Sequence, residues 1–233
     1  MRFILFLALI LLPIAVQAQE QKPFTELFAE RNGRTLKVLE AEFPQDHRML
    51  MVRLGAIERS DQSEMLKLNA AFALLNDLRK HYAPRLRFAP PAALERLLRA
   101  TAAFHERVLE VDGDATCGAF AQNGTGVLYQ LGTSEKYAVE IDRQSAEYFE
   151  AVADAIERPE SYGELQKDDL ALVFRGMLAA GSSQEQVALI LTGPPNAEGY
   201  CAAIAAMFRI AAVLDQPAGL RSRADLAVNL SGY

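Results

Sequence analysis

Apolar side chains recur at steps of three and four residues along most of this chain, and that spacing places them on one face of an α-helix. Between residues 61 and 82 the recurring side chains are Leu68, Phe72, Leu75, Leu78 and Tyr82. Asp61 and Glu64 have the spacing of a capping box and predict the start of this helix. Pro84 cannot continue a helix and predicts its end.

A second stripe begins after Pro90-Pro91 and runs to Asp112-Gly113, a pair typical of a helix end. Its inward-facing side chains are Leu94, Leu97, Leu98, Thr101, His105, Val108 and Leu109. Only residues 83–89 separate this helix from the one before it. We therefore expect the two helices to form an antiparallel hairpin.

Most of the remaining chain shows the same periodicity over shorter stretches. We expect helices over Pro23 to Glu30, Thr35 to Glu42, from Pro44 onward, Ser145 to Ile156, Leu170 to Leu178, Val187 to Leu191 and about Ala197 to Leu214. Ser182 and Glu185 predict a capping box ahead of Val187. Residues 117–141 resist this interpretation and are expected to form a loop with a short helix, and residues 220–233 a frayed tail.

Helix-breaking residues are spread evenly, with no long linker and no internal repeat. These patterns predict an all-α fold, with a single domain of seven to nine helices over residues 19–233. A division into two domains near residues 112–125 is the alternative.

The N-terminus has the three parts of a secretory signal peptide. Met1-Arg2 supplies one positive charge, residues 3–16 are uncharged and apolar, and Val16-Gln17-Ala18 offers small side chains at a cleavage point after Ala18. The apolar run is shorter than the roughly 20 residues of a membrane span. No cysteine follows it to carry a lipid. We therefore expect residues 1–18 to be removed and the protein to be periplasmic or secreted, without stable membrane insertion.

Two cysteines, Cys117 and Cys201, remain in the mature chain. Because an oxidising compartment favours their pairing, we predict one disulfide that closes a loop of 84 positions. In the chain-entropy model such a loop stabilises the fold by roughly 4 kcal/mol. The alternative, a catalytic cysteine, needs a free thiolate and an activating neighbour, and neither cysteine has such a neighbour in sequence.

The balance of charge restricts the partners. Removal of residues 1–18 takes away one Arg and no acid, which changes the formal net charge from −6 to −7. An acidic protein has no electrostatic reason to bind nucleic acid or anionic lipid. A basic protein partner is the kind that this charge favours.

Candidates for chemistry are few. The three histidines, His47, His81 and His105, do not have the spacing of a zinc helix. His105 falls on an apolar stripe, where a core residue with one hydrogen-bond partner is the expectation and a general base the alternative. Asp112 and Asp114 flank Gly113 like the opening of a calcium loop, but the remaining ligands are missing, so a helix end is favoured. His105 and Asp112 stand as catalytic candidates, Asp112 and Asp114 as metal candidates, and no cofactor is expected.

Known catalytic and phosphate-binding motifs do not occur in this sequence. We therefore expect a non-catalytic helical protein that binds another macromolecule, for example as an inhibitor or accessory protein of the cell envelope. Two alternatives stay open. One is an envelope hydrolase with a carboxylate or histidine site, and the other is a carrier with a helix-lined pocket for a small ligand.

Overall fold

The computed structural model describes residues 22–232, and helices are the only regular secondary structure in this part of the chain, which has no strand. The predicted leader and its cleavage point after Ala18 lie outside these residues. The all-α class is confirmed, with eleven α-helices between residues 22 and 232 where seven to nine were expected. None of the helices described combines the length and the apolar character that a membrane crossing needs.

The helices follow one another along the chain with three short 3₁₀ segments among them. They are α1 (Phe24–Arg31), α2 (Gly33–Glu42), α3 (Pro44–Glu58), α4 (Glu64–Tyr82), η1 (Ala83–Phe88), α5 (Pro91–Asn123), α6 (Gly126–Gln130), η2 (Ser134–Tyr137), α7 (Ala138–Glu157), α8 (Asp169–Ala179), α9 (Gln184–Thr192), α10 (Tyr200–Ala211), α11 (Pro217–Val228) and η3 (Asn229–Gly232).

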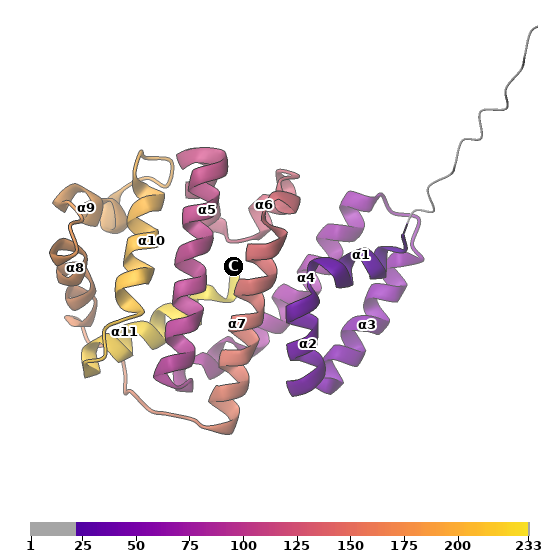
Figure 1. The fold of residues 1–233 in the computed structure, drawn as a ribbon, viewed down its shortest axis with the longest axis horizontal. Coiled ribbons are helices and arrows are strands. Elements are labelled where there is room, and N and C mark those ends of the chain that lie inside the picture. Colours follow the sequence, from indigo (N-terminus) through magenta and orange to yellow (C-terminus); the bar gives the residue numbers. More distant parts are fainter. Residues whose placement is uncertain (1–21, 233) are drawn as a thin grey trace, which may run out of the picture.

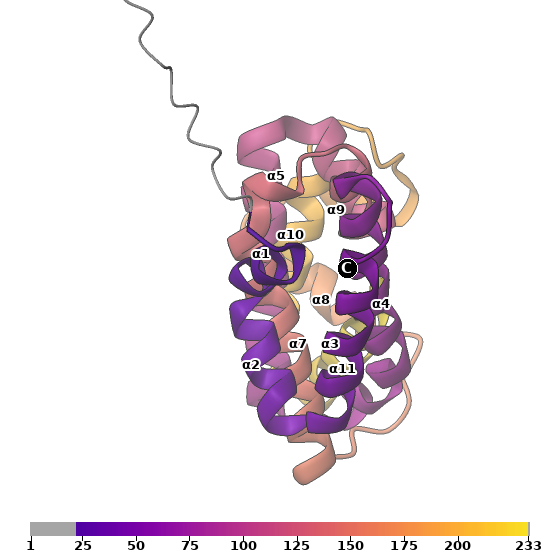
Figure 2. The same ribbon diagram turned by 90° about the vertical axis from the view of Figure 1, so that its right-hand side faces the viewer.

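Helices α7, α5 and α10 stand side by side at the centre of the molecule (Figure 1). Helices α1 to α4 form one end, where α2 packs against α7, and Figure 2 shows this end face on. Helices α8 and α9 form the opposite end and pack against α10. The larger apolar core contains residues from α1 through η3, so that it joins both ends to the central helices.

The expected hairpin of the helices over 61–82 and 90–112 is wrong. Helix α4 packs against α3, η1 and α6, whereas α5 packs against α7 and α10. The connection is not a turn but the 3₁₀ helix η1, which buries Leu86 and leads the chain away from α4. The start of α4 also differs from the prediction, because Ser63 and not Asp61 occupies the N-cap position.

Gly113 interrupts α5. Its φ of 76° and ψ of −177° are not helical, so the helix that begins at Pro91 breaks here, as the Asp-Gly pair predicts, and a second helical segment continues directly to Asn123. The loop expected from residue 117 is therefore wrong in its first part. Packing explains the continuation, because Phe120 is fully buried and its ring centroid lies 4.5 Å from that of Phe104. The rest of 117–141 holds α6, η2 and the first turn of α7.

Two further predictions fail near the C-terminus. The capping box of α9 is formed by Ser183 and Gln186, one residue later than expected. The frayed tail is instead α11, which begins at Pro217. Arg223 of this helix is fully buried, and its guanidinium donates to the carbonyl oxygens of Pro91 and Ala211. A charged residue on the inward face conceals the periodicity of this helix.

Arg79 is a second buried arginine, on the inward side of α4. Its guanidinium donates to Gln144 Oε1 at 3.0 Å and to the Leu230 carbonyl oxygen at 2.8 Å, and it lies 4.5 Å from the centre of the Tyr148 ring. Burial lowers its pKa to about 10, which leaves it charged at neutral pH. Arg79 thus connects α4 to α7 and to η3 through partners that are all uncharged.

Asp142 of α7 caps helix α2 from a distance. The residue at the N-cap position of α2, Asn32, makes no side-chain cap. Instead, the carboxylate of Asp142 accepts the backbone N–H groups of Arg34 at 3.0 Å and Thr35 at 2.9 Å, and the Thr35 hydroxyl at 2.8 Å. A carboxylate at a helix N-terminus satisfies free donors and faces the positive end of the helix dipole. This contact fixes the start of α2 on α7.

Replacement of Asp142 by Ala tests this cap. We expect the Asp142→Ala protein to lose roughly 2 kcal/mol of unfolding free energy, because the backbone N–H groups of Arg34 and Thr35 lose their acceptor, whereas the Thr35 hydroxyl keeps the backbone carbonyl oxygen of residue 142. Urea denaturation measures the loss. Asp77→Ala, which removes an exposed acid of α4, is the matched control and is expected to change the midpoint little; equal effects of the two variants would contradict the cap.

Candidate functional site

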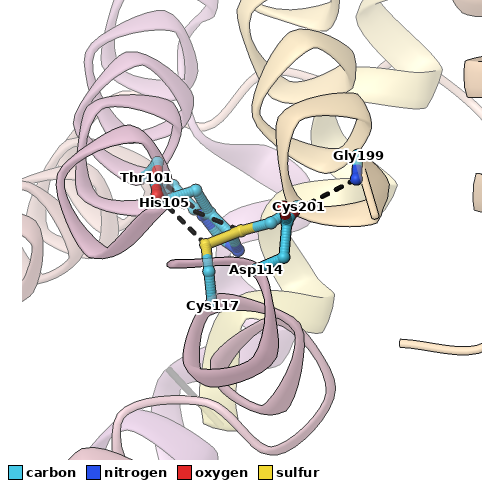
Figure 3. Close-up of a disulfide and its surroundings, with 6 residues drawn as sticks. All are labelled: Thr101, His105, Asp114, Cys117, Gly199 and Cys201. Atoms are coloured by element: carbon cyan, nitrogen blue, oxygen red, sulfur yellow. Dashed lines mark hydrogen bonds between the residues drawn. A yellow bond between two sulfur atoms is a disulfide. The ribbon is translucent and has the colours of Figure 1, made fainter. Parts of the chain in front are cut away.

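The predicted disulfide is confirmed, and it joins two of the central helices. Cys117 follows the bend of α5 and Cys201 lies in the first turn of α10, with their Cα atoms 5.7 Å apart. Both cysteines are fully buried, and Figure 3 shows the bridge between them. Because both sulfur atoms are in the bridge, neither cysteine has the free thiol that a nucleophile needs.

The segment that precedes α10 is held against α5 beside the bridge. Asp114 Oδ1 accepts the backbone N–H of Gly199 at 3.1 Å (Figure 3). Gly199 has a φ of 79°, a conformation that side chains disfavour. A Cβ atom on Gly118 would lie 1.7 Å from the carbonyl oxygen of Pro195, so only glycine permits this approach. Asp114, a metal candidate in the sequence, is thus a structural residue of this junction.

His105 lies fully buried in the same junction. Its Nδ1 is 2.8 Å from the Thr101 carbonyl oxygen, and its ring centroid is 4.7 Å from that of Phe120 and 5.4 Å from that of Phe208. Burial lowers the pKa of the imidazole to about 4, and the hydrogen bond to Thr101 opposes this only in part. The imidazole is neutral at pH 7, and its burial keeps it from a dissolved substrate.

Asp112 is turned toward η2. Its carboxylate accepts hydrogen bonds from Lys136 Nζ and Tyr137 Oη, each at 2.6 Å. Both hydrogen bonds lower the pKa of the carboxyl group, and the bond from Lys136 has the larger effect. Asp112, Asp114 and His105 therefore have separate partners. Across residues 22–232 no group of three or more His, Cys, Asp or Glu side chains converges as a metal site requires.

An apolar pocket lies between α1, η2 and the start of α4, with a volume of about 180 Å³. Its lining consists of Phe24, Leu27, Phe28, Arg31, Glu64, Met65, Leu68 and Glu135. Phe24 and Phe28 are buried, whereas the side chain of Met65 is half exposed. An ion pair between Arg31 and Glu135 joins α1 to η2 at this pocket. A narrower hollow that shares Arg31 and Leu68 continues toward Tyr129.

The pocket was not predicted, although part of its signal is in the sequence. Phe24 and Phe28 are four residues apart, and Met65 precedes Leu68 by three, so each pair shares one helix face. What the periodicity could not supply is the approach of α1 to α4, since their meeting depends on the path of the chain through α2 and α3.

A larger hollow of about 480 Å³ lies between α5 and α7, but its lining differs in kind. Besides Ala100, Ala103 and Phe104 it is lined by charged side chains: Glu106, Arg107, Glu110, Glu140 and Arg143. Arg107 pairs with Glu110 and Glu140, so these charged groups are engaged with one another. Binding sites are mostly apolar with a few polar groups. The pocket between α1, α4 and η2 is therefore the better candidate site.

Comparisons with known proteins found no match: no protein-family model fits the sequence, and neither curated proteins nor solved structures gave a significant similarity. The candidate site therefore depends on the chemistry of its own residues.

The buried His105 makes stability depend on pH. Its pKa is about 4 in the folded protein and about 6.5 in the unfolded chain, so the unfolded state binds the proton first as the pH falls. We expect this residue to cost about 3 kcal/mol of stability between pH 7 and pH 4. In urea denaturation at several pH values, His105→Gln should show a flatter dependence than the wild type. His81→Gln, at an exposed position, should retain the wild-type slope; an unchanged slope in His105→Gln would contradict the assignment.

Proposed function

We propose that this protein works outside the cytoplasm by binding another protein, and that the pocket between α1, α4 and η2 receives an apolar side chain of that partner. The observation that carries the proposal is the size and lining of the pocket. Three of its large apolar side chains, Phe24, Phe28 and Leu68, are held by packing, whereas Met65 is half exposed. The flexible thioether of a methionine adapts to the shape of an incoming group.

The volume favours a single side chain over a free ligand. Pockets for small ligands measure roughly 300–1,000 Å³, whereas this one measures about 180 Å³. A cavity of about 150 Å³ is known to accept benzene. The pocket therefore suits one aromatic or branched aliphatic side chain, of the kind that anchors many protein complexes.

Two exposed acids at the rim, together with the acidity of the whole chain, favour a basic group beside that anchor. The side chains of Glu64 and Glu135 are 66% and 70% exposed; Glu64 pairs with Lys67, and Glu135 pairs with Arg31, the one basic residue of the lining. The chain as a whole is acidic, with a formal net charge of −6. Such a field speeds the approach of a basic partner and selects against an acidic one. We therefore propose a partner segment in which an apolar anchor is followed or preceded by Lys or Arg.

The alternatives from the sequence have less support. A hydrolase built on His105 and Asp112 would need groups that reach one substrate, but His105 is buried and Asp112 is engaged by Lys136 and Tyr137. A small-ligand carrier would use the same pocket as a protein partner. The small volume of the pocket favours the protein partner over the carrier. Mass spectrometry of the intact protein under native conditions tests directly whether a small ligand is bound.

Substitution of Met65 tests the proposal. The mature protein, residues 19–233, is immobilised and exposed to an envelope extract of the source organism, and captured proteins are identified after cross-linking. We expect Met65→Lys to abolish the capture, because it replaces an apolar wall of the pocket by a cation, which disfavours an apolar anchor and repels the basic group proposed beside it. The captured protein should be basic and should bind less well at high salt.

Met49→Lys is the matched control, because Met49 of α3 is 49% exposed against 48% for Met65 and lies outside the pocket. We expect it to capture the partner as the wild type does. Equal loss in both variants, or equal retention, would contradict the assignment of the pocket. A bound small molecule that Met65→Lys displaces would replace the proposal by the carrier.

A further inference from the structure

One stretch of this chain is almost free of charge although it lies at the surface. From Gly176 to Ala197 the only charged residue is Glu185, whereas 23% of the whole chain is charged. This stretch contains the end of α8, the whole of α9 and the loop that follows. A charge-poor segment of this length is expected in a core or at an interface.

Helix α9 is not in the core. All of its residues are described, and none of them is buried, although five in succession, Val187 to Leu191, are apolar. It packs against α8 and α10 on one side and presents Ala188 and Leu191 to solvent on the other. Leu191 is 62% exposed. Helix α9 therefore has an apolar side that the folded chain leaves uncovered.

Helix α8 packs beside α9 and also has exposed residues. Arg175, Leu178 and Ala179 lie one turn apart or less and are all exposed. We define the α8–α9 face as the exposed residues Arg175, Leu178, Ala179, Glu185, Ala188 and Leu191. The face lies at the end of the molecule opposite α1 and its pocket (Figure 1). Two of its members are alanines, whose small side chains allow another helix to approach closely.

The charges of this face are self-complementary. It carries one cation and one acid, Arg175 and Glu185, and Arg175 forms no ion pair with any residue in the described part of the chain. In a two-fold pair each contact occurs twice, so Arg175 of each copy can meet Glu185 of the other. Elsewhere the molecule is acidic, and two copies would repel.

We propose that two copies of this chain associate through the α8–α9 face in a two-fold arrangement. Leu191 and Leu178 lose their exposure to water in the pair, and the single charges of the two copies neutralise each other. A second copy fits this face better than a basic or an acidic protein does, because the face has no net charge to attract either. The association is independent of the pocket between α1, α4 and η2.

Sedimentation velocity over a range of concentrations tests the proposal with the mature, disulfide-bonded protein. We expect a reversible monomer–dimer equilibrium in the wild type. Leu191→Lys places a charge at the most exposed large apolar residue of the face and should raise the dimer dissociation constant by roughly a hundredfold. Val139→Lys is the control, because Val139 of α7 is 76% exposed and lies outside the face; it should sediment as the wild type does.

A charge exchange tests the two-fold pairing itself. Arg175→Glu and Glu185→Arg should each weaken the dimer, whereas the double variant restores opposite charges and should recover most of the association. Circular dichroism verifies that each variant keeps its helix content. A wild-type protein that remains monomeric at every concentration would overturn the proposal, and so would a dimer that Leu191→Lys leaves unchanged. Failure of the double variant to recover would overturn the two-fold pairing of Arg175 with Glu185.

Discussion

The junction between α5 and α10 is the contact on which the rest of the fold depends. Helix α10 packs against α8, α9 and α11. Helix α5 packs against α7, which in turn packs against α2 and so joins the N-terminal helices to the centre. The Cys117–Cys201 bridge joins these two groups of helices across 84 positions of chain. In the chain-entropy model, loop closure of this length removes much of the freedom of the unfolded state. The bridge thus stabilises the packing that positions both ends of the molecule.

Buried polar groups give this packing its specificity. Apolar stripes such as that of α5 can slide or rotate with modest loss, but a hydrogen-bonded group has one set of partners. Asp142 accepts donors only from the start of α2, and Arg79 reaches carbonyl and amide oxygens that no shifted α4 would offer. Arg223 does the same for α11. These three residues select one arrangement among helices that are otherwise joined by apolar contact.

The fold class and the bridge could be predicted because both depend on local or compositional signals. The stripe from Leu94 to Val108 is buried as expected, since periodicity alone determines which face of a long helix is apolar. The bridge followed from the presence of only two cysteines. By contrast, α11 was missed because Arg223 and Ser222 occupy inward positions that a pattern of apolar residues cannot reveal. The pocket was missed because α1 and α4 meet only through the intervening helices.

The position of the pocket and of the α8–α9 face at opposite ends of the molecule has a consequence for assembly. The proposed two-fold pair, joined at α8 and α9, would carry its two pockets at its far ends. If the pocket binds its partner as we propose, such a particle is bivalent and bridges two partner molecules. If the partner is itself clustered on a surface, each particle can engage it twice, and the effective concentration of the second site then raises the avidity without any new contact.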